Sequence, residues 1–265
     1  AATGGAPYAS CIDTERSEAR GTTPLQPDLA LIASATTQAE LTGALGALQR
    51  TGGAGAVGFW VDNDAKDPER YVAYLYQSGL GLPDEAYYRE DQYAPVREKY
   101  VPHVARMLAL AGVTSETWGA SPEDAAERIV ALETRLAAKH WDVVRDRDAD
   151  LTYNPRTLAA LVAEAPGFDW RAWVLALGAP PGSLGDGVGR EPDFAAGFAE
   201  LWASEPLEDW KLWMVYHLVT ARAPYLSADL VEANFDFYGR TRSGGQGVRA
   251  RWMRALARGV GGGAG

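Results

Sequence analysis

Histidine is the residue type in this sequence best suited to metal chemistry, and it occurs three times, at His103, His140 and His217. A zinc-dependent hydrolase of the H-E-x-x-H type needs two His four residues apart, because that spacing points both imidazoles at one metal, and a Glu between them as general base. None of the three has a second His near it in the sequence. We therefore expect packed or surface histidines, with no catalytic residue and no metal ligand in this chain.

Acidic side chains cluster at Asp62, Asp64 and Asp67, which suggests a calcium loop at first sight. A hand-like calcium loop requires Gly at its sixth position and Glu at its twelfth, and those positions are Asp67 and Ala73 here. The stretch is better interpreted as a solvated hairpin loop. The pair Glu208 and Asp209 precedes a helical pattern, where acidic groups favour the helix dipole, so capping is favoured over general acid catalysis.

Other kinds of site find little support. Cys11 is the only cysteine, which excludes an intrachain disulfide and a cysteine-based zinc site. No phosphate-binding G-x-x-x-x-G-K-[ST] loop occurs, and Ser243 has no adjacent base that would make it a nucleophile. The net charge of -10 opposes nucleic-acid binding, and the Arg-rich stretch 240–258 is interpreted as a solvated helix face.

Membrane and targeting signals are not recognisable in the sequence. No run approaches the roughly 18 apolar residues that span a bilayer, and the N-terminus lacks a basic-then-apolar signal pattern. The chain begins with Ala1, so a leader or an upstream segment could be missing, and no compartment is assigned. The Gly- and Ala-rich ends, 1–7 and 259–265, are expected to be a disordered end and a Gly-rich tail.

The elements between these ends follow a helical period. Thr37 with Glu40 forms a capping-box pattern, Ser121 precedes a Pro at the first helical position, and Asp169 precedes a short helix with two Trp. Apolar residues at three- and four-residue steps predict further helices, which cover 92–111, 122–141, 154–165, 192–203, 206–221, 227–237 and 248–258.

Strand character is confined to two stretches. Val57 to Val61 and Tyr71 to Gln77 are rich in aromatic and β-branched residues, and a polar segment with Pro68 separates them. We interpret the pair as a β-hairpin with a long loop and as the only sheet. Segment 178–189 is predicted to be a loop. The fold class is therefore mainly α: a multi-helix lobe, spanning 8–258, with one small β-hairpin.

Several segments, in order, resemble the N-terminal lobe of the neprilysin and endothelin-converting-enzyme family of zinc metallopeptidases. The segments are YASCIDTERSEARGTTPL, FWVDNDAKDPERYVAYLYQSGLGLPDEAYY, LTYNPRTLAAL, FDWRAWV, EDWKLWMVYHLV and ANFDFYGRTRSG, followed by RARWMR. The resemblance covers about Tyr8 to Arg254. It singles out signature or lobe-interface candidates, namely Gly81, Leu82, Pro83, Asp84, Tyr87, Tyr88, Tyr153, Asn154, Asn234, Phe237, Tyr238, Gly239 and Trp252.

The resemblance implies a helical lobe that faces a separate catalytic lobe and gates a cavity for modest-sized peptides. Zinc is expected in the missing catalytic lobe of the parent enzyme, and no cofactor is expected in this chain. The expected partners are that catalytic lobe and peptide substrates, with no nucleic acid and no membrane span. Two departures from the family pattern are expected to matter: Glu85 stands where the family usually has Arg, and the resemblance implies that the family's lobe begins upstream of Tyr8.

Two functions follow as hypotheses. In the first, the chain is the substrate-gating, non-catalytic lobe of a zinc metalloendopeptidase. In the second, it is a stand-alone helical module that binds peptides or proteins without enzymatic activity. An H-E-x-x-H motif in continuous coding sequence after Arg258 would favour the gating lobe. A stop codon after Gly265 would favour the stand-alone module. A fragment is also expected to expose an apolar face around Asn234 to Trp252.

Overall fold

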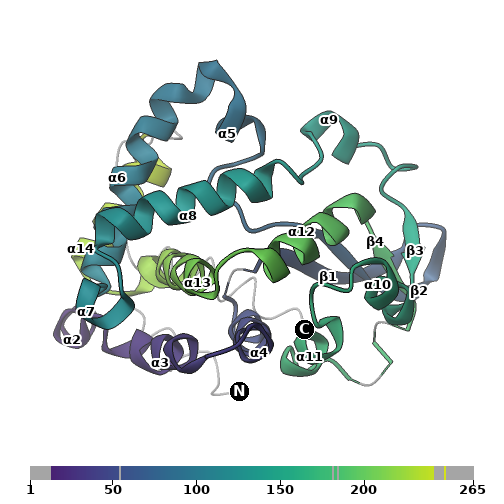
Figure 1. The fold of residues 1–265 in the computed structure, drawn as a ribbon, viewed down its shortest axis with the longest axis horizontal. Helices are drawn as coiled ribbons and strands as arrows, with labels where there is room; N and C mark the ends of the chain where they lie inside the picture. Colours follow the sequence, from purple (N-terminus) through teal and green to yellow (C-terminus); the bar gives the residue numbers. More distant parts are fainter. Residues whose placement is uncertain (1–12, 54, 181, 184, 242–247, 249–265) are drawn as a thin grey trace.

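The computed structural model describes residues 13–53, 55–180, 182–183, 185–241 and 248. Most of this chain is helical, as predicted, and one small sheet lies at one end (Figure 1). The longer helices are α3 (Gln26–Ser34), α4 (Gln38–Arg50), α6 (Ala94–Leu110), α8 (Pro122–Ala137), α12 (Pro192–Ser204), α13 (Leu207–Arg222) and α14 (Ala228–Phe235). The shorter ones are α2 (Thr14–Arg20), α5 (Ala86–Arg89), α7 (Ser115–Trp118), α9 (Val143–Asp146), α10 (Leu158–Glu164) and α11 (Trp170–Ala176).

Helix α13 lies at the centre of the helical layers, between α8 on one side and α3 and α4 on the other (Figure 1). Every residue from Asp209 to Val219 is buried, so the helix is enclosed all round. A helix enclosed in this way belongs to the core of a large domain. Trp210, Trp213 and Tyr216 are fully buried there, which explains much of the aromatic content.

Helix starts follow the predicted caps. The Thr37 hydroxyl accepts a hydrogen bond from the Glu40 amide, and Ser121 does the same for Asp124. The Asp169 carboxylate accepts from the Ala172 amide, 3.0 Å away. These caps satisfy amide groups that the first turn of a helix leaves without partners. The prediction of those three helix starts is confirmed.

The sheet has four strands, in the order β1 (Val57–Asp64), β2 (Asp67–Gln77), β4 (Gly187–Gly189) and β3 (Asn154–Arg156). Strands β1 and β2 form the predicted antiparallel hairpin, with Phe59 opposite Leu75. Strand β4 runs parallel to β2 and antiparallel to β3. The sheet is thus larger than the hairpin that the sequence predicts.

Three local predictions are wrong in detail. The expected long loop of the hairpin is a tight turn, because both strands continue through the polar segment to Asp64 and Asp67. Segment 154–165 begins as strand β3, and its helix starts only at Leu158, where the Thr157 hydroxyl accepts from the Ala160 amide. Segment 178–189, predicted to be a loop, ends in strand β4.

Each of these differences has a physical reason. Pro155 lacks an amide donor, but β3 lies at the edge of the sheet, where that loss is tolerated. Strand β4 is held by pairing with β2, more than a hundred residues away in the chain, and such a distant partner leaves no local periodicity. None of the described helices is long and apolar enough to cross a membrane.

Some predictions lie outside the described residues. They concern both chain ends, Cys11, Ser243, Trp252 and the helix expected over 248–258. The boundaries of the lobe at 8 and 258 therefore remain predictions.

Candidate functional site

The signature segment that follows β2 folds around one buried carboxylate, that of Glu133 on α8. The Tyr88 hydroxyl accepts hydrogen bonds from the Gly81 and Leu82 amides, at 3.1 and 3.0 Å, and donates to Glu133 Oε2 at 2.7 Å. Tyr100 on α6 donates to the same oxygen at 2.8 Å. Glu133 is completely buried, so these donors replace the water that it loses on folding.

The second oxygen of Glu133 meets a histidine. Nε2 of His217, on α13, lies 2.8 Å from Glu133 Oε1. One carboxylate thus links α5, α6, α8 and α13. Burial, followed by the charge of Glu133, raises the pKa of Tyr88 and Tyr100 well above the usual value. Both phenols therefore stay protonated and continue to donate at physiological pH.

Gly81 is required at this point by contact. A Cβ atom there would lie 1.7 Å from the Tyr100 hydroxyl. The neighbouring signature residues have local roles: Asp84 accepts from the Ala86 amide at 3.0 Å, and Tyr87 stacks on Tyr93. Pro83 is exposed. The signature segment therefore combines core residues with an exposed turn.

Glu85, which replaces the family's usual Arg, is buried and is not left without a partner. Its carboxylate accepts hydrogen bonds from Arg89 Nε at 2.6 Å and Arg89 Nη2 at 3.1 Å. The two residues lie one turn apart on α5. The departure from the family pattern is therefore compensated within the same helix.

The C-terminal signature residues join the same core from another side. Phe237 is buried and its ring lies 5.3 Å from Tyr100 and 4.7 Å from His103. The Tyr238 and Tyr216 hydroxyls are 2.9 Å apart. Gly239 lies against the Phe235 ring, and the Asn234 side-chain oxygen is buried without a hydrogen-bond partner.

Tyr153 and Asn154 lie elsewhere, at the sheet. The Tyr153 hydroxyl donates to Asp64 at 2.8 Å, and the Asn154 amide donates to the carbonyl oxygens of Leu151 and Arg190. Asp64 is only 1% exposed, and Arg70 donates to it at 2.6 Å. Asp64 was predicted to lie in a solvated loop, which is wrong, because its side chain is buried and hydrogen-bonded to Arg70 and Tyr153. The hydrogen bond from Arg70, with those from the Lys66 amide and Tyr153, lowers the pKa of Asp64 to about 2.

The histidines are packed side chains. His103 is stacked on Phe237, and His140 Nε2 lies 3.1 Å from the Ser78 carbonyl oxygen. Burial lowers the pKa of both to about 4, so both are neutral at pH 7. Among the described residues, no group of three or more His, Cys, Asp or Glu is placed to hold a metal ion. The described side chains therefore do not fit a zinc site.

The acidic pair at the start of α13 behaves differently from a simple cap. Asp209 is buried and its carboxylate accepts from Arg128 Nε, on α8, at 2.6 Å. Glu208 pairs with Lys211, one turn later. Neither carboxylate caps the helix with a hydrogen bond, although both lie where they favour its dipole.

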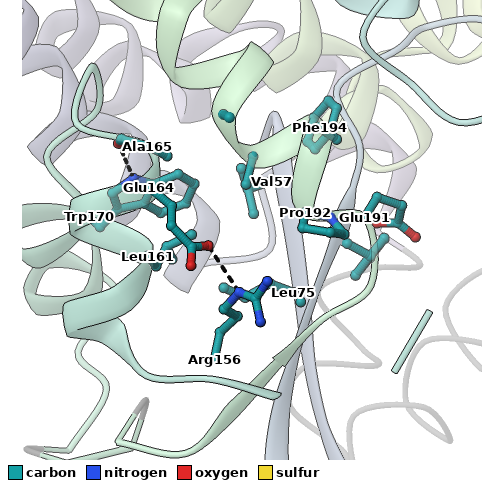
Figure 2. A pocket seen from close by; sticks show the side chains of 14 residues that line it. Val57, Leu75, Arg156, Leu161, Glu164, Ala165, Trp170, Glu191, Pro192 and Phe194 are labelled. Atoms are coloured by element: carbon teal, nitrogen blue, oxygen red, sulfur yellow. Dashed lines mark hydrogen bonds and ion pairs between the residues drawn. The ribbon is translucent and has the colours of Figure 1, made fainter. Parts of the chain in front are cut away.

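Two hollows lie near the sheet. The first, between the sheet, α10 and α12, is apolar and holds about 30 Å³, room for one or two waters (Figure 2). Its walls include Leu75, Leu161 and Phe194, and Arg156 pairs with Glu164 at 2.9 Å beside it. This hollow is a packing defect and is too small for a ligand.

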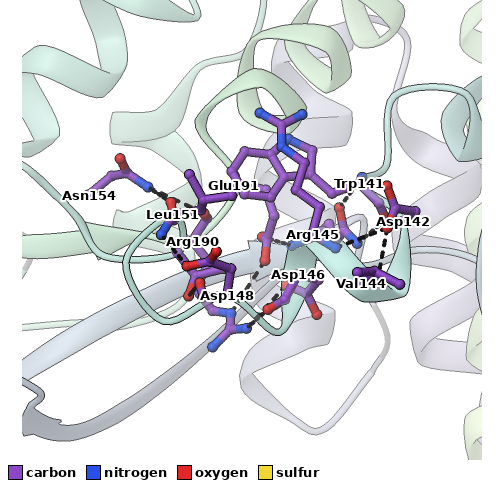
Figure 3. A network of polar contacts seen from close by, with 12 residues as sticks. Trp141, Asp142, Val144, Arg145, Asp146, Asp148, Leu151, Asn154, Arg190 and Glu191 are labelled. Atoms are coloured by element: carbon purple, nitrogen blue, oxygen red, sulfur yellow. Dashed lines mark hydrogen bonds and ion pairs between the residues drawn. The ribbon is translucent and has the colours of Figure 1, made fainter.

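The second hollow is a polar recess of about 410 Å³ beside the signature segment. It is lined by Trp60 and Trp141, by Asp84 from the signature, and by two acids, Asp146 and Glu191. Figure 3 shows Asp146 and Glu191 in a network with Arg190. No local pattern pairs these acids, because Glu191 precedes a Pro at a helix start and resembles an ordinary cap.

This arrangement of elements is found in solved zinc metalloproteases. In its open state, zinc metalloprotease Zmp1 of Mycobacterium tuberculosis superposes with a TM-score of 0.89 at 50% identity, over 95% of this chain and 38% of that protein. Its complex with an inhibitor gives 0.88 at 49% identity, again over 95% of this chain and 38% of that protein. PepO from Lactobacillus rhamnosis HN001, at 20% identity, shares the fold with a TM-score of 0.78, over 96% of this chain and 40% of that protein.

Sequence comparison gives the family. The model of the N-terminal domain of Peptidase family M13 matches residues 4–263, and the chain belongs to that family. Endothelin-converting enzyme 1 of Cavia porcellus is 30% identical over 112 residues, and endothelin-converting enzyme-like 1 of Mus musculus is 31% identical over 120 residues. The matched parts are 42% and 43% of this chain, but only 14% of either relative. The predicted resemblance is confirmed.

Proposed function

We propose that this chain is the non-catalytic, substrate-gating lobe of a zinc metalloendopeptidase that cleaves peptides. The observation that carries the proposal is the superposition of 95% of the chain on 38% of a zinc metalloprotease at 50% identity. The described histidines support it, since each is engaged in the core by Phe237, Ser78 or Glu133. Zinc, and the water that it activates, would belong to a catalytic lobe of the same polypeptide.

The proposed gating role requires the helical lobe to be rigid. A lobe that limits access to a cavity must hold its shape when peptides press on it, and buried hydrogen-bonded networks provide such rigidity. The Glu133 network and the Arg128–Asp209 pair join helices that are far apart in the sequence. The signature residues Pro83 and Asp84, which lie at or near the surface beside this network, are the proposed contacts with peptides or with the catalytic lobe.

The purified chain tests the non-catalytic part. We expect no stoichiometric zinc by elemental analysis and no cleavage of short fluorogenic peptides at any zinc concentration. The matched control is the parent enzyme with its catalytic lobe, which is expected to bind zinc and to cleave. Chelator-sensitive cleavage by the chain alone, with one bound zinc per chain, would overturn the proposal.

A stand-alone binding module is the second candidate, and exposed apolar side chains favour it. Val144 is 82% exposed and Tyr71 is 71% exposed, and exposed apolar side chains can mark interaction sites. The coding sequence beyond Gly265 separates the two candidates. A downstream H-E-x-x-H in the same reading frame supports the gating lobe, whereas a stop codon supports the module.

A further inference from the structure

A pair of carboxyl groups, from Glu191 and Asp146, lies at the joint between the sheet and helix α9. Glu191 is only 3% exposed, and Arg190 brings the two acids together: its Nε lies 3.3 Å from Glu191 Oε1 and its Nη2 lies 3.1 Å from Asp146 Oδ1. The Gln77 amide, at the end of β2, donates to Glu191 Oε2 at 2.8 Å. Two carboxyl groups gathered at one guanidinium in a site with little water favour holding one proton between them, because two adjacent negative charges there repel strongly.

The pair joins three segments that are distant in the sequence. The Gln77 side chain bonds both backbone groups of Trp141, accepting from its amide at 2.7 Å and donating to its carbonyl oxygen at 3.0 Å. Arg190 Nη2 donates to the Asp146 carbonyl oxygen at 2.9 Å and to Asp146 Oδ1 at 3.1 Å. Figure 3 shows Trp141, Asp146 and Arg190 around α9. Segment 141–146 is therefore held to β2 by the Gln77 side chain and to the residue before Glu191 by Arg190.

Few other charges face the pair. Arg190 is the one cation in contact with both carboxyl groups among the described residues. Arg145, on the same helix, is directed to Asp193 at 3.0 Å and stacks on the Trp141 ring. His140 is neutral at pH 7, and Asp84 adds a negative charge to the recess. One guanidinium therefore faces two carboxyl groups and a further acid.

The pKa shifts of the two acids agree with one proton being retained on Glu191 at neutral pH. Burial, followed by the hydrogen bond with Asp146, raises the pKa of Glu191 to about 8. Burial alone would raise the pKa of Asp146, but hydrogen bonds with Glu191 and Arg190 hold it below the usual value. One proton is thus kept on Glu191 at neutral pH.

We propose that the proton shared by Glu191 and Asp146 is a latch that holds α9 and Trp141 against the sheet, and that its loss releases them and widens the recess beside the signature segment. The released segment carries Val143 and Val144, which are 38% and 82% exposed. The latch is independent of the proposed function, because it concerns a motion within this chain.

The direction of the pH effect follows from proton linkage. In the released state both carboxyl groups meet water and regain ordinary pKa values, near 4.5 for Glu191. The latched state therefore binds one more proton between pH 4.5 and about 8. The equilibrium constant for release rises about tenfold per pH unit across that window and levels off above it.

Hydrogen exchange of two backbone amides in the full chain tests the latch. The Gln77 amide donates to Glu191 itself, and the Trp141 amide donates to the Gln77 side chain. After correction for intrinsic exchange, we expect their protection to fall about tenfold per unit from pH 6 to 8 and to change little from pH 8 to 9. Protection that is independent of pH from 6 to 8 would overturn the proposal.

Three variants identify the group responsible. Glu191→Gln removes the titrating carboxyl, so the pH dependence of protection should disappear. Asp146→Asn leaves Glu191 without its partner, so the decline should end at a lower pH; this variant also decides the question should Glu191→Gln fail to fold. Asp193→Asn is the matched control: it removes the exposed ion pair between Arg145 of α9 and the start of α12, so it should lower protection by a similar factor at every pH and keep the wild-type pH dependence. Wild-type profiles in both pair variants would refute the latch.

Discussion

Glycine at position 81 is required by its neighbours, and the reason lies in a carboxylate fifty residues away. The Tyr100 hydroxyl occupies the space beside Gly81 because it donates to Glu133. Tyr88 donates to the same carboxylate while its oxygen accepts from the Gly81 amide. A side chain at position 81 would therefore displace a donor from a buried charge, and a buried charge without donors is costly.

Gly81→Ala is expected to destabilise the chain by about 2 kcal/mol or more, since its Cβ forces Tyr100 away from Glu133. Gly43→Ala is the matched control: it lies inside α4 with open space around it, and should stabilise by about 0.5–1 kcal/mol. Urea unfolding followed by Trp fluorescence measures both. Equal stability of the two variants would contradict the contact argument.

Helix α10 and strand β3 show how an element boundary depends on one side chain. The sequence around Asn154 and Pro155 predicts a helix start, yet the chain first pairs with β4 for three residues. The helix begins only after Thr157, whose hydroxyl accepts from the Ala160 amide at 3.1 Å. The Asn154-Pro155 pattern and the Thr157 cap are both local signals, whereas strand β3 forms only because Gly187 to Gly189 pair with it. The helical pattern alone therefore predicts the start of α10 about one turn too early.

Thr157→Ala is expected to cost about 1 kcal/mol, because it removes the hydrogen bond that caps α10. Thr157→Ser keeps a hydroxyl at the same place and should unfold close to the wild-type urea midpoint. Equal loss in both variants would show that the methyl group, and not the cap, matters at this position.

The folded chain buries groups whose titrations have opposite effects on the pH dependence of its stability. Burial lowers the pKa of His103 and His140 to about 4, so the unfolded chain binds more protons on them between pH 4 and 6.5, and stability falls as the pH falls through that range. The raised pKa of Glu191 has the opposite effect: the folded chain binds the extra proton, and stability falls as the pH rises from 4.5 to about 8.

Stability should therefore peak near pH 6.5. Between pH 4.5 and 6.5 the unfolded chain binds two extra protons, on His103 and His140, and the folded chain binds one, on Glu191. Above pH 6.5 only the proton on Glu191 differs between the two states. The free energy of unfolding therefore falls by roughly 1.4 kcal/mol per pH unit on either side of the maximum. Urea unfolding from pH 5 to 9 measures the profile. A free energy of unfolding that is constant or rising between pH 6.5 and 8 would contradict the prediction, and Glu191→Gln should flatten that limb.

Sequence alone determined the helical class of this chain and most helix starts, because amphipathic spacing and caps act between residues a few positions apart. The family followed from the order of motifs that resemble it, not from periodicity. Thr37, Ser121 and Asp169 each satisfy amide groups within three residues. The resemblance also selected Gly81, Tyr88 and Phe237 as important, without the reason. Only the tertiary structure decided that Gly81 and Tyr88 lie against Glu133 and that Phe237 packs on Tyr100. It also decided that β4 joins the sheet and that Glu191 and Asp146 both contact Arg190. Those contacts join segments tens of residues apart, and the energy that pairs them arises from burial once the chain has folded.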